Sequence, residues 1–111
     1  MNKSSSQFMI DGVEDLLKIV GENIKLARIR RKMTQDELAN RIHVDKRTIS
    51  RMEQGDPSIN FKNLLTVLIT FGIEDSAYEL ASPDKDEVGK SLELLKQPKR
   101  VRSTDTLNDD F

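Results

Sequence analysis

The residues best suited to binding chemistry are basic and polar side chains that recur between positions 46 and 54. On a helix, one face of this segment would be polar and would carry Lys46 at its edge followed by Arg47, Ser50, Arg51 and Gln54. The other face would carry Ile49, Met52 and Glu53 and should pack inward. An Arg guanidinium can donate two hydrogen bonds to O6 and N7 of one guanine. We therefore expect Arg47 and Arg51 to read base edges in a DNA major groove and Lys46 to meet a phosphate.

Such a helix needs a second helix to hold it, and the preceding residues predict one. Thr34 and Glu37 have the spacing of a capping box, in which each side chain satisfies the backbone N–H of the other. An apolar stripe at helical spacing follows, formed by Leu38, Ala39 and Ile42. Asp45 is the expected N-cap of the polar helix, and Gly55 is expected to end it in a left-handed conformation. The pattern is typical of two short helices joined by a tight turn.

Composition and charge narrow the function classes. The chain has 111 residues, no Cys, a single His and a net charge of −1. Residues 19–54 hold nine Lys/Arg against five Asp/Glu, whereas residues 55–95 hold three against eight. A basic motif beside an acidic body is consistent with a protein that binds phosphate groups with one face and makes other contacts with its remaining faces. The alternative is a solvated surface on which charges are distributed at random. We predict no signal peptide, no membrane span, no metal or cofactor and no catalytic site, hence a cytoplasmic, nucleoid-associated protein rather than an enzyme.

The remaining pattern predicts an all-α chain. One helix over about residues 12–32 is possible, with Asp11 and Glu14 as a further capping box, and so is a break at Gly21. Asn60 and Gly72 should bound the next helix, and residues 75–80 should form a short one. After the Ser82-Pro83 cap, a short amphipathic helix should run to Pro98, followed by a disordered tail. We divide the chain into a leader (1–18, possibly extending the first helix), a domain (19–81) and an extension (82–111).

These motifs resemble the helix-turn-helix of phage-repressor and Cro-type regulators, the XRE family, over about residues 19–81. The matching positions are Gln35, Ala39, Ile49 and the pair Arg28 and Glu53. The resemblance implies a five-helix phage-repressor-like domain with a flexible C-terminal extension. It also implies that Gln35 bonds a DNA phosphate, that Ala39 lies where two helices cross, and that Arg28 and Glu53 form a partly buried ion pair. Base and backbone contacts then fall to Lys46, Arg47, Thr48, Ser50 and Arg51, and Lys62 is expected to meet a phosphate.

The tight turn departs from the family pattern in one residue. The position that usually carries Gly holds His43. His is among the few non-Gly residues tolerated at positive φ, so we expect a strained turn residue without chemistry. The alternative is a contact from His43 to DNA or to a partner.

The chain is also similar to a narrower group, the HipB-like regulators and antitoxins of HipA-like serine/threonine kinase operons. The features are the leader around Leu16 to Ile24, the Gly55-Asp56-Pro57-Ser58 turn, Asp86 with Gly89, and the basic run at 98–102. This implies a homodimer that binds an inverted-repeat operator in its own promoter region and holds the kinase in a complex. Leu107 and Phe111 are candidates to dock on that partner, and the alternative is a tail that is simply disordered. The alternatives are a stand-alone phage-type repressor and a protein-interaction scaffold without DNA readout.

Overall fold

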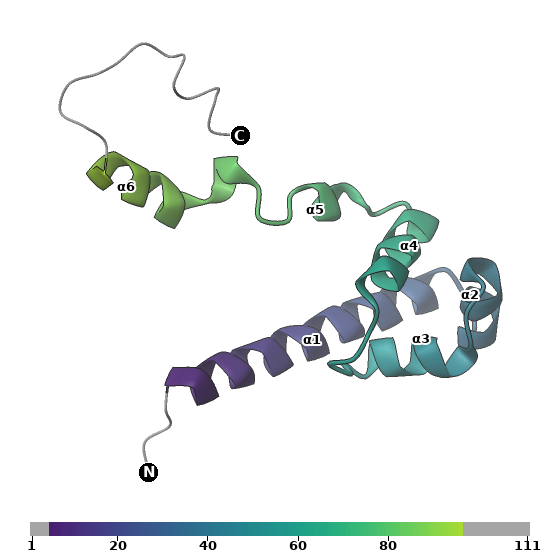
Figure 1. Cartoon of the computed structure of the whole chain (residues 1–111). Helices are drawn as coiled ribbons and strands as arrows, with labels where there is room; N and C mark the ends of the chain where they lie inside the picture. The colour runs from purple at the N-terminus through teal and green to yellow at the C-terminus, as the bar shows by residue number, and fades with distance from the viewer. Residues whose placement is uncertain (1–4, 97–111) are drawn as a thin grey trace. The chain divides into compact units, whose positions relative to one another are not determined.

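The computed structural model describes residues 5–96, and every regular element among them is helical. The chain divides into two compact units, residues 1–77 and residues 78–111. The elements, shown in Figure 1, are α1 (Ser5–Arg30), α2 (Gln35–Ile42), α3 (Lys46–Glu53), α4 (Phe61–Phe71), α5 (Asp75–Tyr78), the 3₁₀ turn η1 (Pro83–Lys85) and α6 (Glu87–Lys96). The expected all-α class with a helix-turn-helix domain is confirmed. The tail expected to be disordered, with Leu107 and Phe111, lies outside the described residues.

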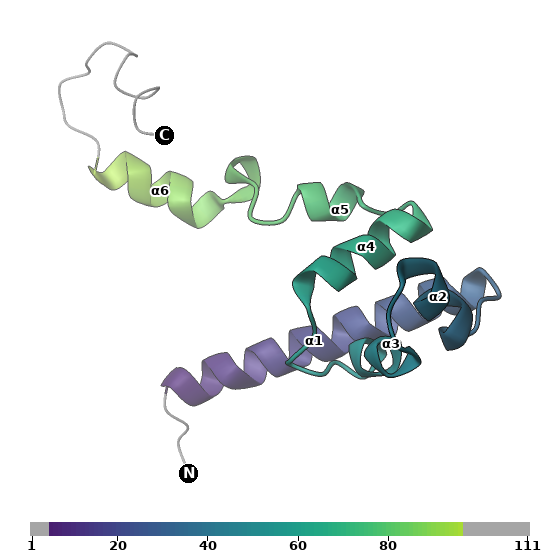
Figure 2. The same ribbon diagram turned by 45° about the vertical axis from the view of Figure 1, so that its right-hand side comes forward.

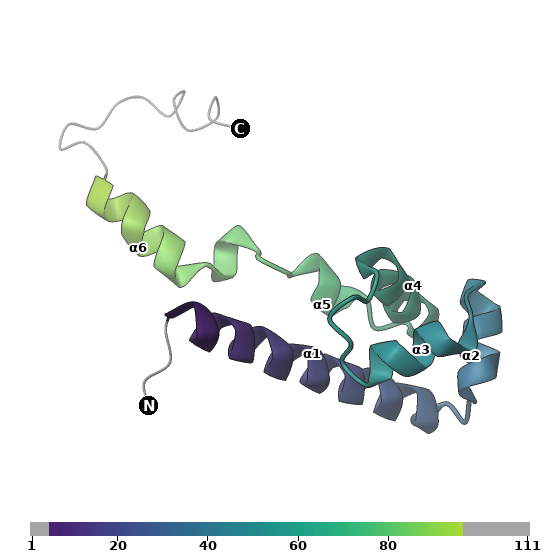
Figure 3. The same cartoon turned by 60° about the horizontal axis from the view of Figure 1, so that its bottom comes forward.

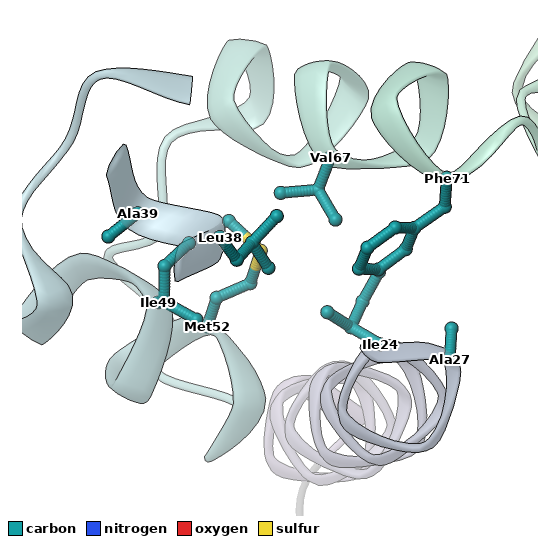
Figure 4. Close-up of a cluster of buried hydrophobic side chains, with 8 residues drawn as sticks. All are labelled: Ile24, Ala27, Leu38, Ala39, Ile49, Met52, Val67 and Phe71. Carbon is teal, nitrogen blue, oxygen red and sulfur yellow. The ribbon is translucent and has the colours of Figure 1, made fainter. Parts of the chain in front are cut away.

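The core of the first unit lies among α1, α2, α3 and α4. Its most deeply buried side chains come from the two helices of the motif and from α4: Leu38, Ile49, Met52 and Val67. Figure 4 shows Val67 and Phe71 of α4 pointing toward Ile24 of α1 and toward the side chains of α2 and α3. The inward face predicted for α3 is therefore the buried one, and its polar face is left outside.

Local signals set where the helices begin and end. Thr34 Oγ1 accepts from the Glu37 N–H at 3.0 Å and Glu37 Oε1 accepts from the Thr34 N–H at 2.7 Å, which confirms the capping box. Asn60 caps α4 through the Asn63 N–H, and Gly72 ends it at φ +74°. Asp45 occupies the N-cap position of α3, but its side chain makes no capping hydrogen bond, so that part of the expectation was wrong.

The first helix is longer than the sequence pattern indicated. Helix α1 begins at Ser5 and runs unbroken through Gly21, so Asp11 lies inside the helix and does not cap it (Figure 2). Gly21 is needed for a different reason. A Cβ there would stand 2.5 Å from the Glu53 backbone oxygen and 2.6 Å from that of Met52. Gly21 thus lets α1 cross the end of α3 at backbone contact.

The second unit contains η1 and α6. Pro83 opens η1 at the first helical position as expected, although the Ser82 side chain makes no capping bond. Asp86 Oδ1 accepts from the Gly89 N–H at 2.8 Å at the start of α6. Three apolar residues at helical spacing on one side of α6, Val88, Leu92 and Leu95, are exposed. Helix α5 ends at Tyr78, two residues earlier than expected, and α6 is described to Lys96.

Candidate nucleic-acid interface

The turn between α2 and α3 has the geometry that the motif requires. His43 ends α2 at φ 62° and ψ 47°, the left-handed conformation predicted for it. Its N–H donates to the Asn40 carbonyl at 3.3 Å, and the Val44 N–H donates to the Ala39 carbonyl at 2.9 Å. Ala39 is 2% exposed, which agrees with the small residue expected where helices meet. The backbone strain at His43 is therefore tolerated because it lets the chain turn sharply between α2 and α3.

The outer face of α3 is polar and open. Lys46, Arg47, Arg51 and Gln54 are exposed, and Thr48 and Ser50 are half-buried. Ile49 and Met52 point the opposite way, into the core (Figure 4). An eight-residue helix with this division can present two guanidinium groups and an ammonium group to a groove while its other side is fixed.

A buried ion pair holds the end of α3. Arg28 Nε lies 2.6 Å from Glu53 Oε2, and Arg28 Nη2 donates to Glu53 Oε1 at 3.0 Å. Arg28 Nη1 also donates to the Met33 carbonyl at 2.8 Å. Its hydrogen bond with the Glu53 carboxylate raises the pKa of Arg28 above the ordinary value. Since the two residues are only 9% and 5% exposed, this two-pronged pair locks α1 to α3, as the sequence predicted.

Gln35 joins this network. Its Nε2 donates to Glu53 Oε1 at 3.0 Å, so the side chain expected at a DNA phosphate is held inward in the free protein. The amide nitrogen has a second N–H, and Gln35 is the first residue of α2, where backbone N–H groups lack helical partners. The proposed phosphate contact and the bond to Glu53 are thus compatible.

The Arg51 side chain has a neighbour, Asp56, that the sequence analysis named only as part of a turn. Arg51 Nε lies 4.0 Å from Asp56 Oδ2. Asp56 Oδ1 accepts from the Ser58 hydroxyl at 2.7 Å and from its N–H at 2.8 Å, and these bonds lower the pKa of Asp56. Asp56 is therefore a fixed anion at the C-terminal end of α3 that steers the Arg51 guanidinium.

An open polar groove of about 390 Å³ lies beside α3. It is lined by α1, α2 and α3 through Lys18, Glu22, Lys25, Gln35, Ser50, Glu53 and Gln54. The sequence analysis missed Lys18 and Lys25, whose seven-residue spacing places them on one side of a helix only once α1 is known to be continuous. The ammonium groups of Lys18 and Lys25 thus lie beside the outer face of α3 and come from a different helix.

Two other basic positions lie apart from this groove. Lys62 is exposed in the first turn of α4, and it does not line the groove. Arg31 has a structural role that was not foreseen. It donates to the Ala27 and Phe71 carbonyls at 2.8 and 2.9 Å, and its guanidinium lies 4.8 Å from the Phe71 ring centroid. The basic run at 28–32 is therefore partly occupied in fastening α1 to α4.

Among residues 5–96, no group of three His, Cys, Asp or Glu side chains could hold a metal ion. Within the same residues, no helix is long and apolar enough to cross a membrane.

Comparison with known proteins agrees with this geometry. Residues 24–76, from the C-terminal part of α1 to α5, match a helix-turn-helix family model. No curated protein and no solved structure matches the chain. The match and the geometry of α2 and α3 agree that this segment is a helix-turn-helix.

Proposed function

We propose that this protein is a sequence-specific repressor that reads its operator with the outer face of α3. The observation that carries the proposal is the exposed set Lys46, Arg47 and Arg51 on a helix whose other face is buried. Thr48 and Ser50 add shorter contacts, while Gln35, at the start of α2, and Lys62 meet phosphates. Phosphate contacts position the helix, and the two Arg side chains supply the sequence preference.

The operator is an inverted repeat in the protein's own promoter region, bound by a homodimer. One helix of eight residues covers only a few base pairs, so selectivity needs two copies about one DNA turn (~34 Å) apart. The protein acts in the cytoplasm, at the nucleoid. The division into residues 1–18, 19–81 and 82–111 stays a prediction.

We further propose that the protein is the antitoxin of a HipA-like serine/threonine kinase. The support is the resemblance to HipB-like regulators in the leader, the Gly55-Asp56-Pro57-Ser58 turn and the tail motifs. Leu107 and Phe111 would enter apolar pockets on the kinase, with tail carboxylates beside them. Deletion of residues 104–111 should weaken the purified kinase complex in calorimetry and leave operator affinity unchanged. Equal kinase affinity after the deletion would reject this docking.

A scaffold without DNA readout is the competing function, and the exposed Arg47 and Arg51 argue against it. Fluorescence anisotropy with the promoter DNA beside the gene, and with a scrambled duplex, separates the two. A repressor should prefer the promoter, and its affinity should fall steeply with salt. As a matched control, Lys85→Ala removes a cation that pairs with Glu79 in the second unit, and it should bind normally. Equal and weak binding of both duplexes would favour the scaffold function instead.

A further inference from the structure

The N-terminal half of α1 carries an apolar stripe that no described residue of the first unit covers. Met9, Ile10, Val13 and Leu16 are 69%, 50%, 55% and 62% exposed. Successive apolar positions alternate in spacing between three and four residues, as in a heptad seam: Ile10, Val13, Leu17, Val20, Ile24 and Ala27. The C-terminal half of the seam packs into the core, since Ile24 and Ala27 are buried there. The N-terminal half carries the same seam in an exposed state, on the part of α1 that extends beyond α3 (Figure 3).

The N-terminal half of α1 is attached to the rest of the first unit by close backbone contacts at its C-terminal end. A Cβ at Gly55 would stand 2.8 Å from Lys18 Cα, and Gly21 touches the backbone of Glu53. These two close approaches fix α1 against the end of α3 as far as Lys18. The segment before Leu17, residues 5–16, spans roughly 18 Å at 1.5 Å per residue. Beside it lies an apolar hollow of about 260 Å³ lined by Met9, Ile10, Val13, Glu14 and Pro57.

We propose that residues 5–16 of α1 form the dimer interface, packed antiparallel against the same segment of a second copy. This rests on the homodimer of the proposed function and assigns its surface. The stripe and Pro57 on two copies would bury on the order of 1,000 Å², the lower bound for a specific interface. An isologous contact of this kind needs only one surface that complements itself.

The buried C-terminal half of the seam limits how a second copy can pack against α1. A parallel partner in register that followed the seam would run along Val20 to Ala27, where the protein's own core already packs. An antiparallel partner uses only residues 5–16 and leaves the two cores at opposite ends. The pair is then a short coiled-coil contact between two rigid domains.

The antiparallel arrangement also gives the spacing that DNA requires. Helix α3 meets α1 at Gly21. With the two-fold axis between residues 10 and 11, at the middle of residues 5–16, Gly21 and its copy lie roughly 32 Å apart along α1, because each residue advances 1.5 Å. One turn of DNA is about 34 Å, so the two recognition helices fall close to adjacent major grooves.

The recognition faces also point the same way. Lys18 and Lys25, which line the groove beside α3, lie about a third of a turn around α1 from the seam. The two-fold axis of two antiparallel helices is perpendicular to the plane that contains both. It therefore keeps the two grooves on one side, where a single duplex can meet both.

Sedimentation velocity on the full-length chain, without DNA, tests the surface. Val13→Glu places a charge in the seam and should weaken dimerisation at least about tenfold. The matched control is Phe8→Glu, which changes a residue of similar exposure, 67%, on the opposite side of the same helix and should leave the dimer intact. Circular dichroism melts establish that both variants fold. A dimer lost in Phe8→Glu and kept in Val13→Glu would overturn the assignment.

Direction is tested by distances between single labels, which the absence of Cys makes simple. Spin labels on Asp15→Cys and on Glu22→Cys lie outside the seam. In the antiparallel dimer the distance between copies should be longer at 22 than at 15 by more than about 10 Å. Equal distances would mean parallel packing and would reject the proposal.

The outcomes separate this inference from the proposed function. A Val13→Glu monomer that still binds a half-site, but has lost the preference for the full inverted repeat, supports both. A Val13→Glu chain that stays dimeric overturns the interface and leaves the homodimer. The unmodified protein could instead be a monomer, and Val13→Glu could lower its melting temperature at every protein concentration. That result would mean that the stripe is covered within one chain, and it would overturn the proposed interface. Loss of specific DNA binding in the parent would instead refute the proposed function.

Discussion

The two faces of helix α3 differ in burial and in how their charged groups are satisfied. Its inward face holds Ile49, Met52 and Glu53 at 0%, 1% and 5% exposure, and the Glu53 charge is matched by two hydrogen bonds from Arg28. Its outward face holds Arg47 and Arg51 in solvent, and Asp56 is the acidic side chain that approaches Arg51 among the described residues. Buried groups must be satisfied inside the free protein, whereas exposed groups are left for a ligand. Changes to the first face should therefore appear in stability, and changes to the second in binding.

The largest expected effect is on the inward face. Glu53→Ala or Arg28→Ala strands a buried charge and should lower the free energy of unfolding by about 3–5 kcal/mol in urea titrations. The double variant should be no worse than either single one, because the pair acts as a unit. Additive losses of stability would show that the two side chains are not coupled. The inward face of α3 would then not depend on this ion pair in the way described above.

Gly21→Ala tests the other contact on this side of α3. The added Cβ meets two backbone oxygens that cannot rotate away, so we expect a loss of about 1–3 kcal/mol, measured by thermal and urea unfolding. Gly12→Ala is the matched control on the same helix. No atom lies within 4 Å of its Cβ position, and higher helix propensity should stabilise it by up to about 1 kcal/mol. Equal effects at the two glycines would contradict the close crossing.

The outward face should respond in the reverse manner. Arg51→Ala should weaken specific operator binding by about 1–3 kcal/mol in anisotropy titrations while the melting temperature stays unchanged. Lys62→Ala, by contrast, should weaken specific and scrambled DNA about equally and flatten the salt dependence. Normal operator binding by Arg51→Ala would mean that another face reads the DNA.

The sequence predicted features that depend on near neighbours and missed those that depend on how helices cross. The capping box at Thr34 and Glu37, the positive φ of His43 and the ends of α4 are set within a few residues, so local patterns were sufficient. The sequence left the continuity of α1 at Gly21 open, and it missed the groove with Lys18 and Lys25 and the Arg31 contacts to Phe71. Each of these features depends on contact between different helices, whose approach no local spacing encodes.

The turn that joins α2 to α3 gives a smaller effect. His43→Gly relieves strain but loosens the unfolded chain, so the net change in stability should be within about 1 kcal/mol. His43→Val should be clearly destabilising in the same urea titrations, because β-branched residues tolerate positive φ poorly. Since His43 is exposed, neither change should alter the core. A Val variant as stable as the parent would contradict the left-handed turn.

The smallest effect concerns Glu37, far from both faces of α3. Its carboxylate accepts from the Thr34 N–H, and this bond, with a contribution from the Thr34 side chain, lowers the pKa of Glu37 below its ordinary value. A carboxyl group with a lowered folded-state pKa stabilises the protein above its unfolded pKa, about 4.3, and loses that contribution as the pH falls through the folded value. We therefore compare melting temperatures of the parent and Glu37→Gln, which keeps a capping acceptor without the charge. The parent should melt higher at neutral pH, and the difference should shrink as the pH falls below about 4. A constant difference would show that the charge at Glu37 contributes nothing and that geometry alone makes the cap.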